Sequence, residues 1–181
     1  MKKFLVIIAL LCLHFTSQAQ LRYYDQWAPG INAGITSKKG YFASAGIEKY
    51  FNRKLGSIAL HLNYMRNSQF FLIKDFNITT ITISTSYFHS LERVVKPPFF
   101  INVGAGIFAG SESFEKEKKL PEGIVQNADT RFVYGITFKP QAEYLFSKKV
   151  SLLFQPQADY YIESKYSSFV FILSLGLKIY L

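Results

Sequence analysis

The sequence predicts an all-β protein: an eight-stranded antiparallel up-and-down transmembrane β-barrel of the outer-membrane type. Three observations predict this fold. The C-terminal segment alternates strictly between apolar and small or polar residues, the N-terminal segment is typical of an exported protein, and seven further alternating segments lie between them. Beta-branched and aromatic residues dominate these segments, and turn-forming residues separate them.

The C-terminal segment, residues 169–181, carries the clearest signal. Read in steps of two, one face holds only large apolar residues: Phe169, Phe171, Leu173, Leu175, Leu177, Ile179 and Leu181. In a membrane barrel that face would meet hydrocarbon, while the mixed face would line a narrow interior. The segment also resembles the C-terminal sorting signal of bacterial outer-membrane barrels through Ser174, Gly176, Ile179 and Leu181.

The N-terminal segment, residues 1–19, has the features of a secretory signal peptide. Lys2 and Lys3 supply positive charge, an apolar run follows, and Ser17-Gln18-Ala19 fits a cleavage site. The apolar run is too short to span a membrane as a helix. The single cysteine, Cys12, lies within this segment. We therefore expect a mature chain, residues 20–181, that forms one domain without disulfides and is exported to the outer membrane.

The formal charge is +9, and it falls to +7 when Lys2 and Lys3 are left out. The remaining basic residues are scattered over expected turns, and no groove-reading motif accompanies them. The sequence therefore predicts solvated turns or contacts with anionic lipid headgroups. It predicts no direct binding of nucleic acid.

The seven other strands are expected at about 30–37, 41–51, 57–66, 77–90, 99–110, 131–146 and 149–162. A soluble lipocalin-like barrel would show the same alternation with its large apolar face inward, so alternation alone leaves both barrels open. Loop lengths favour the membrane barrel, because its outer loops are longer than its periplasmic turns. The periplasmic turns are expected near 52–56, 91–98 and 147–148, and the outer loops near 38–40, 67–76, 111–130 and 163–168.

Two prolines interrupt this pattern. Pro140 and Pro156 fall nearly opposite each other on the lipid-facing sides of neighbouring expected strands. Because proline cannot donate to a β-ladder, we expect a local bulge there.

The search for catalytic residues gives little. His61 is expected to point inward, and His89 lies beside Ser90, so a histidine–serine pair could act as base and nucleophile if a carboxylate oriented it. No nucleophile motif is present, and too few histidines remain for a metal site. We therefore expect no enzyme activity and no catalytic, cofactor-binding or metal-binding residues. We read Gly104-Ala105-Gly106 as room for bulky neighbours inside the barrel rather than as a nucleotide loop.

Alternation places Glu48 on the inner face of the barrel, together with a group of four further charged residues: Lys139, Glu143, Asp159 and Lys178. Burial in a narrow interior requires paired charges. Strand register places Glu143, Leu153 and Lys178 at about one height and Lys139 within diagonal reach of Asp159, so we expect these charges to pair. The expected outer loop 111–130 is long and charged. It is the best candidate for contact with a partner or another cell, although a solvated surface loop explains it as well.

From Phe99 onward the order of features resembles the TraO family of conjugative-transposon transfer proteins of Bacteroides-type bacteria. The residues that carry the resemblance are Gly104, Ala109-Gly110, Glu112, Leu120-Pro121-Glu122-Gly123, Phe132, Tyr134-Gly135, Glu143-Tyr144-Leu145, Val150, Leu152-Leu153 and Gly176-Leu177-Lys178-Ile179. The first half is similar mainly in length and in Ala28-Pro29-Gly30.

This resemblance implies a non-enzymatic outer-membrane part of a DNA-transfer apparatus, in contact with membrane lipid and other envelope proteins. Two further classes stay open. One is a general outer-membrane barrel for adhesion or envelope stability, and the other is a lipid-modifying barrel enzyme.

Overall fold

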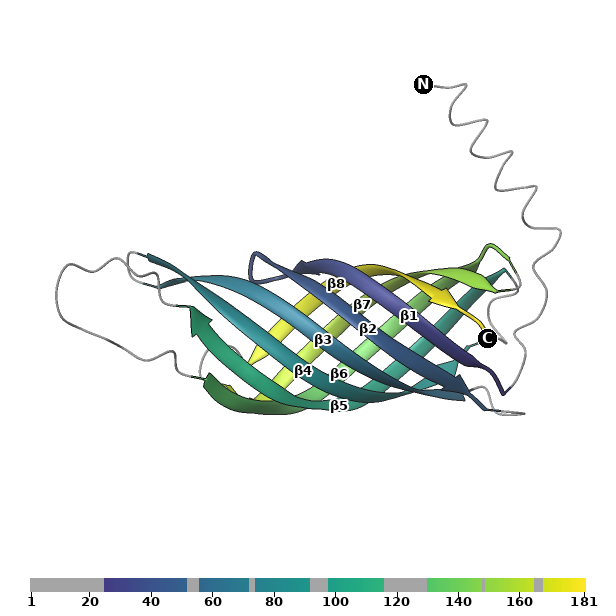
Figure 1. The fold of residues 1–181 in the computed structure, drawn as a ribbon, viewed down its shortest axis with the longest axis horizontal. Helices are drawn as coiled ribbons and strands as arrows, with labels where there is room; N and C mark the ends of the chain where they lie inside the picture. Colours follow the sequence, from purple (N-terminus) through teal and green to yellow (C-terminus); the bar gives the residue numbers. More distant parts are fainter. Residues whose placement is uncertain are drawn as a thin grey trace, which may run out of the picture.

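The computed structural model is a closed barrel of eight antiparallel strands, which pair in chain order and close through β1 and β8 (Figure 1). It describes residues 25–51, 56–71, 74–91, 98–115, 130–147, 149–164 and 168–181. The strands are β1 (Trp27–Thr36), β2 (Gly40–Tyr50), β3 (Gly56–Phe71), β4 (Lys74–Ser90), β5 (Phe99–Glu115), β6 (Thr130–Leu145), β7 (Val150–Glu163) and β8 (Phe169–Ile179). No helix in these ranges is long and apolar enough to cross a membrane.

All eight predicted strands are present. β1 begins at Trp27 rather than near residue 30, and β3, β4 and β5 extend into the predicted loops. Strands β3 and β4 pair as far as Phe71 and Lys74, and β5 pairs with β4 as far as Glu115. The predicted loop 67–76 and the start of the predicted loop 111–130 were therefore wrong. These extensions carry mostly polar residues, so their backbone pairs without the apolar alternation that identifies a strand in the sequence. Residues 1–24, 52–55, 72–73, 92–97, 116–129, 148 and 165–167 lie outside the described residues.

We call the end of the barrel where β1 starts and β8 ends the terminal end, and the opposite end the distal end. The C-terminus lies at the terminal end, and the β3–β4 hairpin projects at the distal end (Figure 1). The β1–β2 hairpin is shorter and closes in a turn at residues 37–39. The distal rim is therefore uneven in height.

The barrel wall is apolar on the outside and largely polar on the inside. On β8 the alternation is complete in the middle of the strand, where Leu175 is 57% exposed and Ser174 is 1% exposed. Large apolar side chains point outward along every strand. A soluble barrel places such residues inside, so the lipocalin-like alternative is wrong and the fold is that of a membrane barrel.

Two apolar clusters close the interior near its ends. The cluster toward the distal end consists of Phe42, Met65, Phe108, Val133, Tyr161, Val170 and Ile172. The cluster at the terminal end consists of Ala28, Tyr50, Phe100, Leu145 and Tyr180. Most of the buried charged residues lie between them, on the inner faces of the strands. The interior is thus a packed core with a polar middle, as eight strands require.

Exposed aromatic side chains lie near both ends of the outer wall. Near the terminal end they are Trp27, Tyr87 and Phe99, and toward the distal end they are Tyr41, Phe132, Tyr134, Tyr160 and Phe169. Membrane barrels carry aromatic girdles at the two lipid–water interfaces. The band between these residues is therefore the part of the wall that fits the hydrocarbon layer.

The two prolines face each other directly, and the ladder between β6 and β7 is interrupted around them. Pairing runs to Phe138↔Ala158 on one side and resumes at Ala142↔Phe154 on the other without a change of register. The predicted bulge at Pro140 and Pro156 is therefore wrong. The register shift of this strand pair lies at Tyr134/Gly135, nearer the distal end.

The glycines of β5 confirm part of their predicted role. A Cβ atom on Gly104 would lie 2.5 Å from the ring of Phe88, so this glycine makes room for a bulky interior side chain. On Gly106 the nearest obstacle is the Thr85 carbonyl oxygen, so there the space is needed for close approach of two backbones.

Candidate functional site

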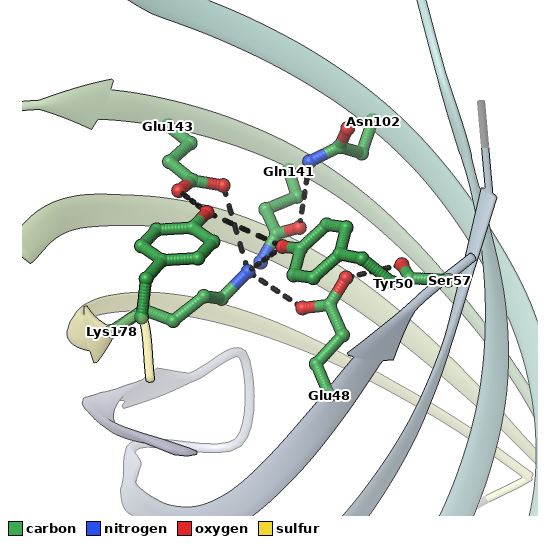
Figure 2. Close-up of polar contacts among 8 residues, drawn as sticks. Glu48, Tyr50, Ser57, Asn102, Gln141, Glu143 and Lys178 are labelled. Atoms are coloured by element: carbon green, nitrogen blue, oxygen red, sulfur yellow. Dashed lines mark hydrogen bonds and ion pairs between the residues drawn. The ribbon is translucent and has the colours of Figure 1, made fainter. Parts of the chain in front are cut away.

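The most developed polar arrangement in the barrel is centred on Lys178, which points inward from β8 (Figure 2). Its ammonium group lies 2.6 Å from Glu48 Oε2 on β2 and 3.5 Å from Glu143 Oε2 on β6. It also donates a hydrogen bond to the Tyr50 hydroxyl at 2.8 Å and lies 5.5 Å from the centre of that ring. One buried cation thus joins three strands that are distant in sequence.

Hydroxyl groups around this ion cluster donate hydrogen bonds to its carboxylates. Two carboxylates share one ammonium group, which leaves one negative charge in excess if all three are ionised. Ser57 donates to Glu48, and Tyr180 donates to Glu143. Hydrogen bonds to a carboxylate stabilise its charged form, so these hydroxyls offset part of the desolvation cost. Both carboxylates therefore have a cation and a hydroxyl donor as partners inside the barrel.

The predicted pairing of Glu143 with Lys178 is confirmed. Glu143 lies opposite Leu153 and Leu153 opposite Gly176, so Lys178 stands one inward-facing step closer to the terminal end. Its long side chain reaches back across this step to the carboxylate.

No direct hydrogen bond or ion pair joins Lys139 to Asp159, although the two opposite charges attract each other inside the barrel. Lys139 donates instead to Ser84 Oγ at 3.1 Å, across the interior on β4. Both carboxylate oxygens of Asp159 accept from the Gln157 amide, at 2.9 and 2.8 Å. The residue facing Asp159 across the β6–β7 pair is Thr137, so Lys139 lies two residues farther along β6. Its side chain extends away from β7, toward Ser84 on β4.

Glu48 is the partner that the sequence did not reveal. Alternation placed it on the inner face, but its contact with Lys178 depends on two ladders, β1–β2 and β1–β8. The second ladder joins the ends of the chain, and it sets Lys178 opposite Gly30 and Glu48 opposite Ala28 on the two sides of β1. Strand length and pattern do not determine that closing register. The tyrosines Tyr50 and Tyr180 were missed for the same reason.

A small cavity of about 10 Å³ adjoins this cluster, lined by Asn32, Glu48, His61, Gln141 and Lys178 among others. That volume has room for a single water molecule. Within the described residues, Asn32 Oδ1 and His61 Nδ1 are buried without a hydrogen-bond partner, and both belong to this lining. A water molecule there would have polar partners. The cavity is too small for a substrate.

The histidines do not form a catalytic pair. His61 is on the inner face of β3 opposite Gly46, whereas His89 is exposed on the outer face of β4. Ser90, next to His89, is buried on the inner face, so the two side chains point to opposite sides of the wall. Among the described residues, no group of three or more histidine, cysteine, aspartate or glutamate side chains could hold a metal ion.

These features define a class: an inside-out, eight-stranded barrel with a packed polar interior, the fold of small outer-membrane barrels. Solved structures with this fold are similar to the chain at low sequence identity. A major outer membrane protein from Thermus thermophilus aligns with a TM-score of 0.64 at 12% identity, covering 86% of this chain and 99% of that one. Neisserial surface protein A aligns with a TM-score of 0.61 at 14% identity, covering 86% and 96%.

A third structure of this fold is the attachment invasion locus protein Ail of Yersinia pestis, in complex with the heparin analogue sucrose octasulfate. It aligns with a TM-score of 0.58 at 9% identity, covering 88% of this chain and 100% of that one. No curated protein matches the chain. At such identities the similarity shows the fold alone.

The chain belongs to the TraO family, described as conjugative transposon protein TraO, whose family model matches residues 23–181. The resemblance seen in the second half of the sequence is therefore confirmed, and family membership extends through the first half as well. The match covers all eight strands.

Proposed function

We propose that this protein is a non-enzymatic outer-membrane component of a conjugative DNA-transfer apparatus. On this proposal, residues 1–19 are a cleaved signal peptide and residues 20–181 form the barrel in the outer membrane, with its distal end outward. The observation that carries the proposal is the family match over the whole barrel, which joins a conjugative-transposon family to a wall that is apolar on its outer face.

The closed interior supports a structural role rather than a conduit. Apolar clusters lie toward both ends, and the cavity beside Lys178 holds about one water molecule. Eight strands leave no aqueous channel, so DNA has no path through this lumen. The protein then contributes through its surfaces, in contact with membrane lipid and with other envelope proteins of the apparatus. It makes no direct contact with the transferred DNA.

The proposal is tested by transfer frequency in mating experiments. A donor that lacks this gene should lose transfer, and the wild-type gene supplied in trans should restore it. Unchanged transfer from the deletion donor, measured with the same recipient, would contradict the proposal.

Two variants separate the remaining classes. A His61→Ala protein should leave lipid A unchanged and support transfer in proportion to the barrel that folds. If the protein were a lipid-modifying enzyme with His61 as its base, the His61→Ala strain would lose the modification, and its lipid A would differ from that of the wild type. Deletion of residues 116–129, between β5 and β6, separates adhesion from transfer. If cell binding is lost while transfer persists, the barrel is an adhesin.

A further inference from the structure

Three of the described basic residues lie together on one side of the distal rim of the barrel. Lys38 and Lys39 form the turn between β1 and β2, and Arg66 lies beside them on β3. On the other side of the rim Glu112 of β5 lies opposite Arg131 of β6, so charges of both signs meet there. We propose that the basic side, which we call the basic rim (Lys38, Lys39 and Arg66), binds the phosphate groups of anionic lipids in the outer leaflet. This inference rests on the proposed outer-membrane location.

The height of the basic rim fits lipid headgroups. Tyr41 and Tyr64 lie side by side on the outer wall, with their ring centres 6.1 Å apart, and Tyr41 is half exposed. Tyrosines in such positions mark the lipid–water interface. Arg66 is directly opposite Tyr41 in the β2–β3 register, so it starts at the same level. Lys38 and Lys39 lie in the β1–β2 turn, two to three residues before Tyr41.

The turn that carries the lysines is held by its neighbours on both sides. The Ser37 amide donates to the Phe171 carbonyl of β8 at 2.8 Å, and the Ser68 amide donates to the Lys38 carbonyl at 3.2 Å. These bonds hold the turn against β3, next to Arg66. A cationic group that is already in place loses less freedom when it binds an anion.

The backbone of Lys39 adds a second indication. Its φ angle is 52°, a left-handed conformation that glycine or asparagine adopts at lower cost. A lysine here keeps a positive charge at the tip of the turn despite that cost. Cations beside an anionic membrane surface each contribute about 1 kcal/mol of attraction, which is roughly a fivefold change in binding.

The test uses the full mature barrel in phosphatidylcholine nanodiscs that contain either monophosphoryl lipid A or the same glycolipid after dephosphorylation. Lipid retained per barrel is counted by native mass spectrometry. The wild type should retain the phosphorylated form preferentially. The triple variant Lys38→Gln, Lys39→Gln, Arg66→Gln should retain on the order of tenfold to a hundredfold less of it. A Lys38→Arg, Lys39→Arg variant should bind as the wild type does.

Lys49→Gln is the matched control, because Lys49 is a basic residue at the opposite end of β2, the strand that follows the turn, and is paired with Asp25 at 2.8 Å. It should leave retention unchanged. Equal retention of the two glycolipids by the wild type, or equal loss in the control, would overturn the inference and leave the proposed function intact. Displacement of lipid by millimolar inorganic phosphate would assign the site to free phosphate and overturn it too. A barrel that does not insert at all would overturn the proposed function, and this inference with it.

Discussion

At the scale of single residues, Lys178 links the last strand of the barrel, β8, to β2 and β6. Its ammonium group serves Glu48 and Glu143, both of which are almost completely buried. Removing one partner of a buried ion pair leaves a charge without compensation, and the loss exceeds what the pair itself contributes. The effect of each substitution therefore depends on how many charges it leaves unpaired.

We expect Lys178→Met to lower the free energy of unfolding by about 3–5 kcal/mol, because it leaves two buried carboxylates without their cation. Glu143→Gln should cost less, since Lys178 keeps Glu48 and Tyr180 can still donate to the amide oxygen. Urea unfolding in lipid vesicles, followed by tryptophan fluorescence, measures both. The triple change Glu48→Gln, Glu143→Gln, Lys178→Met should recover part of the loss. A triple variant as unstable as Lys178→Met would show that charge is not the cause.

The outer wall gives a second prediction at this scale. Leu175, near the middle of β8, is 57% exposed on the face that should meet hydrocarbon. Leu175→Arg should cost about 2–4 kcal/mol, whereas an arginine near the interface costs about 0–1 kcal/mol. Leu181→Arg, at the terminal end of the same face, is the matched control. Equal unfolding free energies for the two variants in vesicles would mean that this face lies outside the hydrocarbon.

At the scale of elements, the ladder between β6 and β7 is interrupted at two prolines. The Phe146 amide donates to the Val150 carbonyl, and the alternation of backbone direction from there turns Pro140 and Pro156 toward each other. Neither proline has an N–H group, so each carbonyl faces a partner that cannot donate. In a membrane this is costly, because no water replaces the missing donors.

Replacing both prolines with valine should therefore stabilise the barrel. Each restored ladder bond contributes about 1 kcal/mol, and the greater freedom of the unfolded chain offsets about 0.4–1 kcal/mol per site. The cost of unpaired carbonyls in lipid adds to the gain, so we expect a net stabilisation of about 1–2 kcal/mol. The single variants restore one bond each and should give about half. If the double variant unfolds at lower urea than the wild type, the interruption contributes to stability in another way.

The elements also show how far sequence pattern reaches. Alternation located the cores of all eight strands because each has one face with large apolar side chains exposed on the outside of the barrel. It failed at 67–71 and 111–115, where the strands continue but the sequence loses its regular apolar alternation. The expected bulge at the prolines was wrong for a different reason. The sequence shows that the prolines cannot form ladder bonds. It does not show whether the strands respond with a bulge or keep the same register on both sides.

At the scale of the whole molecule, closure decides which residues meet. The Glu143–Lys178 pair was predictable, because short connections link β6, β7 and β8 and set their registers. The Glu48–Lys178 pair was not, because it depends on the pairing of β1 with β8. Lys139 pairs with Ser84 rather than with Asp159 because a long side chain can cross a narrow barrel.

Function was predictable only through the family resemblance, because the cavity beside Lys178 has room for about one water molecule and the histidines form no catalytic pair. The central claim is that the apolar outer wall lies in the outer membrane. The most direct measurement is the electrophoretic mobility of the protein from fractionated donor cells, with and without boiling. The account predicts that the protein stays with outer membranes after carbonate extraction and migrates differently unless boiled. Release by carbonate, with one mobility under both conditions, would contradict it.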